Sequence, residues 1–211
     1  YEICLSDWSS DVCSSDLELD WLYKAGGASR VFCREWQDYV SAIQTHMALD
    51  ADNVKARSGQ SSVLLNAYDK VLQEGTKTQA LAMARAWCTW EDALSSVYPG
   101  DPAHASQASQ EEDMKCLAMA KISAHMFAHD PELGSQGHIV PNTSDNFLKN
   151  IPGIIVQGQF DMVTPPETAW QLKQVWPLAQ LRVVHTAGHS SQDPELQSAL
   201  VTALDDMLTE V

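Results

Sequence analysis

The apolar residues of the chain repeat at two different spacings, one in each half. Between residues 31 and 43 the apolar side chains stand three or four positions apart, which places them on one face of an α-helix. The same spacing predicts three further helices, over residues 61–74, 76–97 and 111–128. The pattern therefore indicates a helical region that extends to about residue 128.

After residue 141 the pattern changes to short apolar runs that alternate with amphipathic stretches. Residues 151–156 and 181–184 are predicted to be strands, and residues 165–175 and 194–210 are predicted to be helices. This order is typical of a parallel sheet covered by helices, and it indicates an α/β fold. Two strands do not form a stable open sheet of this kind, so we expect further strands upstream in a longer protein.

Composition and charge narrow the classes of protein. The chain has 211 residues, 45% of them apolar, and 28 acidic against 13 basic residues give a net charge of -15. A field of this sign repels phosphate, which argues against nucleic-acid and anionic-membrane partners. No apolar run approaches the roughly 20 residues that span a bilayer. We therefore expect an acidic cytoplasmic protein.

The five cysteines have no paired short spacing. This predicts reduced thiols, neither a disulfide framework nor a zinc knuckle, with Cys33, Cys88 and Cys116 as buried apolar residues.

Residues 1–17 differ from the rest of the chain in composition and in hydrophobic pattern. They are rich in serine and aspartate and have no clear amphipathic period. One interpretation is a disordered acidic tail. Read as codons, residues 7–17 agree with a translated sequencing-library adapter, and this favours a segment that is not native to the protein. The native sequence before Glu18 is then expected to be missing.

Two polar residues follow the two predicted strands. Asp161 lies in the loop after the first strand and His189 in the loop after the second. Functional groups of open α/β sheets collect beyond the carboxyl ends of the strands, so both side chains are expected at one edge. A carboxylate there can accept the imidazole N–H and stabilise the imidazolium. The alternatives are a helix cap for Asp161 and an ordinary turn for His189, but the order Asp then His favours a catalytic pair.

Several segments resemble the proline iminopeptidase family of α/β-hydrolases. In the second half they are residues 151–170, 176–177 and 187–190. In the first half they are the Gly-Ala-Ser of residues 27–29, Phe32, Trp36, and the Trp-x-x-Trp-Glu of residues 87–91. The resemblance covers nearly all of residues 18–211. It implies a helical cap domain over residues 18–145 and the C-terminal part of an α/β-hydrolase core over residues 146–211.

The resemblance also implies a function, that of a serine peptidase releasing N-terminal proline from small peptides without a metal or an organic cofactor. Asp161 and His189 would be two members of its triad. The third, a serine in Gly-x-Ser-x-Gly, is absent from the 211 residues and is expected upstream, so the chain alone is expected to be inactive. Glu91 would bind the substrate's protonated amine, and Trp87 and Phe160 would line the substrate site.

Three positions depart from the family pattern. Ser123 and Met126 stand where the family usually has a second glutamate and a tyrosine, and Gln159 stands where it often has arginine. Loss of a carboxylate should weaken amine recognition, so an amidase or esterase of other specificity is an alternative. A non-catalytic ligand-binding protein is another.

Two further sets of residues admit a purely structural interpretation. The alternatives to substrate binding are that Glu91 is a solvated helix residue and that Trp87 belongs to the core. His125 and His129 are four apart on a predicted helix, but no third ligand is evident, so no metal site is expected.

Overall fold

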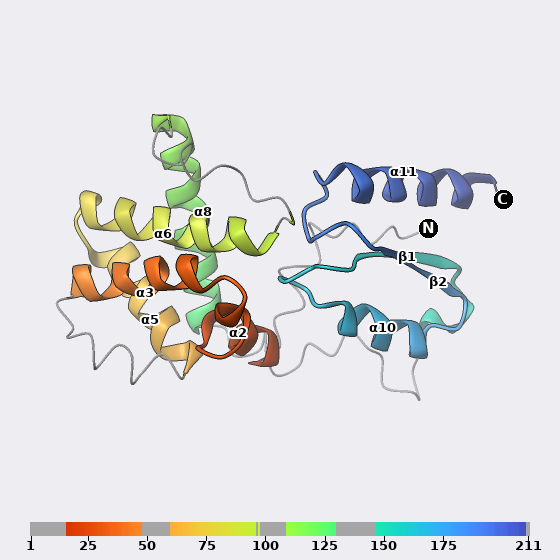
Figure 1. Cartoon of the computed structure of the whole chain (residues 1–211), viewed down its shortest axis with the longest axis horizontal. Helices are drawn as coiled ribbons and strands as arrows, with labels where there is room; N and C mark the ends of the chain where they lie inside the picture. The colour runs from red at the N-terminus through yellow and green to blue at the C-terminus, as the bar shows by residue number, and fades with distance from the viewer. Residues whose placement is uncertain (1–15, 48–59, 96, 98–108, 130–146, 210–211) are drawn as a thin grey trace. The chain divides into compact units, whose positions relative to one another are not determined.

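The computed structural model describes residues 16–47, 60–95, 97, 109–129 and 147–209, and these combine many helices with two parallel strands (Figure 1). They divide into two compact units. The helical unit comprises Asp16–Ala93 and Tyr98–Glu132. The strand–helix unit includes Leu94–Val97 and Leu133–Val211. Residues 1–15 of the predicted adapter segment lie outside the described residues.

The helical unit is built from helices that the sequence pattern mostly anticipates. In chain order its elements are α2 (Asp16–Tyr23), η1 (Ala28–Arg30), α3 (Cys33–Met47), α5 (Ser61–Glu74), α6 (Lys77–Ser95) and α8 (Gln110–His129). The last two residues of α6 are assigned to the other unit. The predicted bounds of α5 are confirmed to the residue. Helix α2 was not predicted: it has only eight residues, and a helix this short depends on packing rather than on intrinsic propensity.

Reciprocal side-chain caps explain where two of these helices begin. The backbone N–H of Thr76 donates to Gln79 Oε1, and the N–H of Gln79 donates to Thr76 Oγ1. Ser109 and Glu112 exchange the same pair of hydrogen bonds before α8. Each pair satisfies two N–H groups that the first helical turn leaves unpaired, so α6 begins at Lys77 and α8 at Gln110.

Aromatic side chains form the centre of the helical unit. Tyr39 and Tyr68 stack with ring centroids 4.3 Å apart, and the Tyr68 hydroxyl donates to the backbone oxygen of Tyr39 at 2.7 Å. The buried rings come from α2, α3, α5 and α6, and they are Tyr23, Trp36, Tyr39, Tyr68, Trp87 and Trp90. Ring contacts therefore join four helices in one core.

The cysteines correct the expectation from the sequence. Cys88 of α6 and Cys116 of α8 form a disulfide, and Cys33 is an exposed thiol. The expectation of three buried, reduced thiols was wrong. The two bonded cysteines are 28 residues apart, and only the packing of two helices brings them together.

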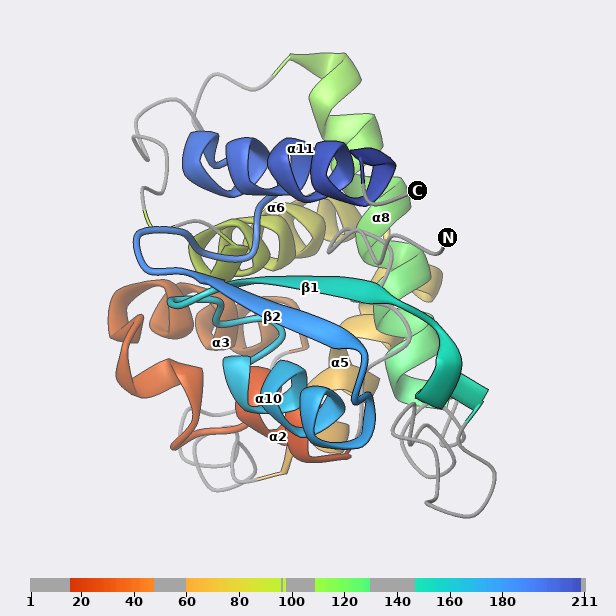
Figure 2. The ribbon, with the colours of Figure 1, turned by 90° about the vertical axis from the view of Figure 1, so that its right-hand side faces the viewer.

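The strand–helix unit has a helix on each face of a two-stranded sheet (Figures 1 and 2). After η2 (Phe147–Asn150) come β1 (Gly153–Gly158), α10 (Pro166–Val175), β2 (Ala179–Val184) and α11 (Pro194–Thr209). The strands are parallel, with a register from Gly153 opposite Ala179 to Gly158 opposite Val184. The predicted order and parallel direction of the strands are confirmed.

Apolar side chains that alternate along β1 pack against α10 on one face of the sheet and against α11 on the other. Ile155 packs with Ala169 and Trp176 on the side of α10. Val156 packs with Leu196 and Ala203 of α11 on the opposite side, as successive side chains of a strand require. The strand begins two residues after its predicted start, because Pro152 has no N–H to donate to a neighbouring strand.

The loops that follow the two strands are in backbone contact. Gln159 N–H donates to Val184 O at 2.9 Å, and Phe160 N–H donates to Ala187 O at 3.0 Å. A Cβ on Gly158 would lie 2.0 Å from Gly188 O, which is less than any real contact allows. Glycine at position 158 is therefore what lets the two loops approach.

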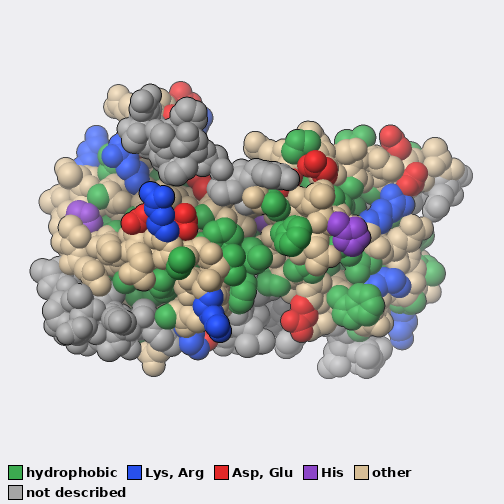
Figure 3. Space-filling model, viewed as in Figure 1, with side chains coloured by type: hydrophobic (Ala, Val, Ile, Leu, Met, Phe, Trp, Pro, Cys, Tyr) green, Lys and Arg blue, Asp and Glu red, His purple; other side chains and the backbone are tan. Residues whose placement is uncertain are grey.

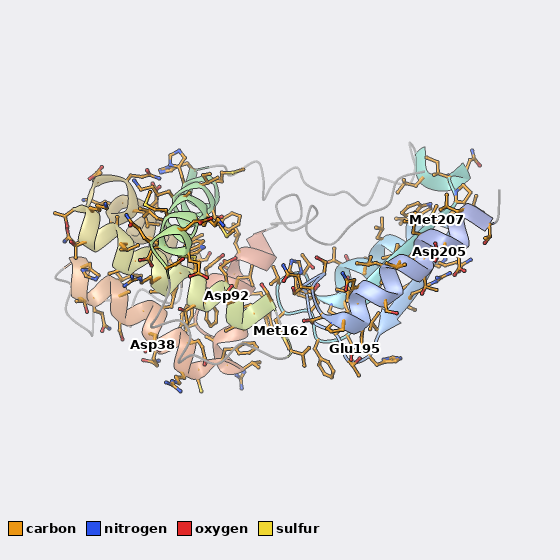
Figure 4. The ribbon with its side chains drawn as sticks, turned by 90° about the horizontal axis from the view of Figure 1, so that it is seen from above. Asp38, Asp92, Met162, Glu195, Asp205 and Met207 are labelled. Carbon is orange, nitrogen blue, oxygen red and sulfur yellow. A yellow bond between two sulfur atoms is a disulfide. The ribbon has the colours of Figure 1, made fainter. Side chains whose placement is uncertain are left out.

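The strand–helix unit carries exposed apolar side chains (Figure 3). Val201, Leu204 and Leu208 of α11 are 55%, 39% and 67% exposed, three and four positions apart, and so share one side of that helix. Figure 4 labels Asp205 and Met207, which lie between them in the sequence. Among the described helices, none combines the length and apolarity needed to cross a bilayer.

The disulfide yields a first prediction. Because it closes a loop of 28 residues, the Cys88→Ser/Cys116→Ser double variant should lose about 3–4 kcal/mol of unfolding free energy, measured by urea titration. Non-reducing peptide mapping should recover the two cysteines in one cross-linked peptide. Cys33→Ser is the matched control and should leave stability unchanged. Complete alkylation of Cys88 and Cys116 without reductant would contradict the assignment.

Gly158 yields a second prediction. In Gly158→Ala the new methyl group meets the backbone of Gly188, so the variant should be destabilised by about 1–3 kcal/mol in thermal or urea unfolding. Gln159→Ala changes the exposed neighbouring residue and should stay within about 0.5 kcal/mol of the parent. Equal stability of Gly158→Ala and the parent would show that the loops do not approach this closely.

Candidate active site

The carboxylate of Asp161 and the imidazole of His189 meet beyond the ends of the two parallel strands. Asp161 Oδ2 lies 3.0 Å from His189 Nδ1, and the two side chains are only 3% and 9% exposed. Asp161 follows β1 and His189 follows β2, 28 residues later. Parallel strands end at the same edge of a sheet, which is why these two loops bring the side chains together.

Four further hydrogen bonds hold the Asp161 carboxylate. Oδ1 accepts the backbone N–H groups of Val163 and Thr164 at 3.0 and 2.8 Å. Oδ2 accepts Thr164 Oγ1 at 2.8 Å and Gln157 Nε2 at 3.1 Å. Asp161 thus organises its own loop and also contacts His189. It does not cap α10, whose N-cap is Pro165 without a side-chain cap bond, so the alternative interpretation of Asp161 as a helix cap was wrong.

Backbone contacts fix the His189 segment. The N–H groups of His189 and Ser190 both donate to Ser95 O, at 2.9 and 2.8 Å. Ser95, the last residue of α6, belongs to the same compact unit. Gly188 N–H donates to Oδ2 of Asp193, a buried carboxylate just before α11. The histidine therefore sits on a backbone held from both sides.

This arrangement suits acid–base chemistry. A carboxylate that accepts Nδ1–H fixes the tautomer of the ring, so that Nε2 carries the lone pair of a base. The same carboxylate stabilises the imidazolium once the ring has taken a proton. Thr164 Oγ1 lies 3.2 Å from Nδ1 and adds a second polar contact to that nitrogen.

Phe160 lies directly before Asp161 and is 49% exposed. Its backbone N–H is bound to Ala187 O, so its position follows from the contact between the two loops. Figure 4 labels Met162, the residue on the other side of Asp161. An exposed ring beside the carboxylate can offer an apolar surface to a ligand.

Glu91, in the helical unit, is half-buried beside aromatic residues. Its Oε1 accepts a hydrogen bond from the hydroxyl of Tyr23. Burial, and after it the charge of Glu91, raises the pKa of Tyr23 well above its usual value, so the hydroxyl stays protonated and donates. Glu91 therefore presents a carboxylate oriented by a buried tyrosine.

The structure places Trp87 behind this carboxylate as a core residue. It is 0% exposed, and its ring stacks on Tyr23 with centroids 5.1 Å apart. Its Nε1, the Nε1 of Trp90 and the hydroxyl of Tyr39 are buried, with no hydrogen-bond partner among the described residues. Contact of Trp87 with a ligand would thus need movement of its neighbours.

Sequence reasoning missed several residues that support the Asp161–His189 pair. Gln157 lies near the end of β1 and Thr164 in the loop of Asp161, and Asp193 lies four positions after His189, so polar residues close to each motif were a usable signal. Ser95 acts through its backbone oxygen and left no signal in the sequence.

The structure also adds a residue to the pair His125 and His129. Asp69 of α5 lies against both, and these three side chains form a cluster able to hold a metal ion. The sequence showed no third ligand because Asp69 is 56 residues from His125.

The chain is similar to several known proline iminopeptidases. It is 35% identical over 191 residues to that of Neisseria gonorrhoeae, covering 90% of this chain and 54% of the relative. Identity is 33% to that of Xylella fastidiosa strain Temecula1, with 55% of the relative covered, and 30% to that of Arabidopsis thaliana, with 45% covered. No protein-family model matches the chain. The chain spans about half the length of the curated relatives it matches, and over that part it is similar to the proline iminopeptidase family.

Proposed function

We propose that this chain is the cap and C-terminal part of an α/β-hydrolase that releases N-terminal proline from small peptides. Residues 18–145 are the cap, residues 146–211 belong to the hydrolase core, and residues 1–17 are not native. The observation that carries the proposal is the buried 3.0 Å contact between Asp161 and His189 beyond two parallel strands. The identity of 30–36% to several proline iminopeptidases supports it.

In this proposal a serine from the remainder of a longer protein is the nucleophile. His189 Nε2 takes the proton of the serine hydroxyl as the serine oxygen attacks the scissile carbonyl. The imidazolium then gives that proton to the departing amine, which leaves an acyl-enzyme. A water molecule, deprotonated by His189, hydrolyses the acyl-enzyme and regenerates the serine. Asp161 orients the ring and stabilises its charged form, and no metal or organic cofactor is needed.

Glu91 is proposed to bind the protonated amine of the substrate. An ammonium ion that leaves water needs an opposite charge, and a half-buried carboxylate offers one. Tyr23 orients the carboxylate, and the surrounding aromatic rings provide the dry environment that suits a proline ring. Phe160 is proposed to line the substrate site from its exposed position, and Trp87 to support it from the core.

One observation favours a second candidate, an amidase or esterase of different specificity. On α8, Ser123 and Met126 stand at positions where the family pattern has an acidic and a phenolic side chain. With one carboxylate instead of two, selection for a charged amine is weaker, and esters or amides of other residues become competing substrates.

The catalytic pair yields a third prediction. In the protein expressed from the complete reading frame of the parent gene, His189→Ala and Asp161→Asn should each lower kcat on proline 2-naphthylamide by about 10³-fold or more. Circular dichroism should show that both variants remain folded. His185→Ala, which removes an exposed histidine, is the matched control and should keep full activity.

The 211-residue chain by itself should show no turnover, because it contains no Gly-x-Ser-x-Gly sequence. Equal kcat in His189→Ala and the parent would remove His189 from the mechanism.

Glu91 yields a fourth prediction. In the same full-length protein, Glu91→Gln should lower kcat/KM for proline 2-naphthylamide by about tenfold to a hundredfold, as loss of a partly dry ion contact implies. An N-acetylated substrate has no ammonium group, so its slow turnover should not change. Glu74→Gln, at an exposed helix end, is the matched control. A similar loss on both substrates would assign Glu91 a purely structural role.

A further inference from the structure

Three side chains of the helical unit converge where α5 packs along α8. His125 Nδ1 lies 3.2 Å from Asp69 Oδ1, and His129 Nε2 lies 2.7 Å from Asp69 Oδ2. The two histidines are one helical turn apart on α8, with ring centroids separated by 4.6 Å. One carboxylate from α5 thus faces two imidazoles from α8.

The separations of the donor atoms fit a single small cation. All three ligand atoms lie within 4.8 Å of one another. Zinc binds nitrogen and oxygen ligands at about 2.0–2.2 Å, which sets tetrahedral ligand atoms about 3.3–3.5 Å apart. The 3.2 Å between His125 and Asp69 is already close to this value, and the 2.7 Å between His129 and Asp69 has to widen by about 0.6–0.8 Å to reach it. The two histidine side chains are each more than half exposed, so they have room to rotate towards a shared ion.

The surroundings of the cluster differ on its two sides. The Asp69 side chain is only 11% exposed, and Gln73 Nε2 lies 3.3 Å from Asp69 Oδ1. The same Gln73 nitrogen donates to Lys121 O on α8, so one amide steadies the carboxylate and ties the two helices together. A ligating carboxylate is usually held by such an outer hydrogen bond. The histidine side is open to water, which can supply a fourth ligand.

We propose that Asp69, His125 and His129 bind one zinc ion, which clamps α5 to α8. Two imidazoles and one carboxylate are a common zinc ligand set, and two histidines four positions apart on a helix are a common way to present it. On binding, the ion replaces the two hydrogen bonds to Asp69, and each neutral imidazole carries its proton on the ring nitrogen that faces away. The site is independent of the proposed peptidase chemistry.

Zinc titration of the 211-residue chain tests the site directly. After removal of metal with EDTA and exchange into chelator-free buffer, isothermal titration with zinc chloride should show one saturable site per chain. His125→Ala and His129→Ala should each weaken its affinity by about tenfold or more. His185→Ala is the matched control, and its affinity should equal that of the parent. Cobalt chloride should give the visible absorption bands of a four-coordinate ion in the parent and lose them in His129→Ala.

Thermal unfolding distinguishes zinc binding that holds α5 against α8 from non-specific binding at the surface. Saturating zinc should raise the melting temperature of the parent and of His185→Ala by the same amount, and it should raise that of His129→Ala by clearly less. The half-exposed histidines are altered, rather than the buried Asp69, so that the variants stay folded. Absence of saturable binding, or equal zinc affinity in the parent and both histidine variants, would overturn the proposal. So would binding without any gain in melting temperature.

Discussion

The hydrogen bond between Asp161 and His189 depends on how closely two loops approach each other. Parallel strands end at one edge, but their following loops meet only because Gly158 has no Cβ to collide with Gly188 O. Backbone hydrogen bonds from Gln159 and Phe160 then hold the second loop against the first. The carboxylate, itself fixed by two backbone N–H groups, can therefore hold the imidazole in one orientation. Acid–base chemistry at this edge rests on that backbone geometry.

Much of the fold could be predicted from the chain, because it follows from local patterns. Helical spacing located α5 and α8, and β-branched runs located both strands and their parallel order. Helix α2 could not be found this way, since its eight residues depend on tertiary contacts. The predicted start of β1 lies two residues too early, because Ile151 and Pro152 adjoin the apolar run that forms the strand.

Contacts between residues far apart in the sequence were mostly not predictable from it. The positions of Asp161 and His189 could be anticipated because both follow strands of one sheet. The pairing of Cys88 with Cys116 and the contact of Asp69 with two histidines depend on which helices pack together, and spacing along the chain does not encode that. The disulfide also bears on compartment. Such bonds are typical of oxidising environments, so it does not support the expectation of a cytoplasmic protein.

The two-stranded sheet has a consequence for assembly. Among the described residues, β1 and β2 pair only with each other, so each strand has one side whose N–H and C=O groups no described strand satisfies. Any polypeptide that extends this sheet, whether the rest of a longer chain or another copy, would join it through main-chain atoms. Main-chain hydrogen bonds of this kind are open to almost any sequence, and the side chains on the two faces of the sheet decide which strand fits.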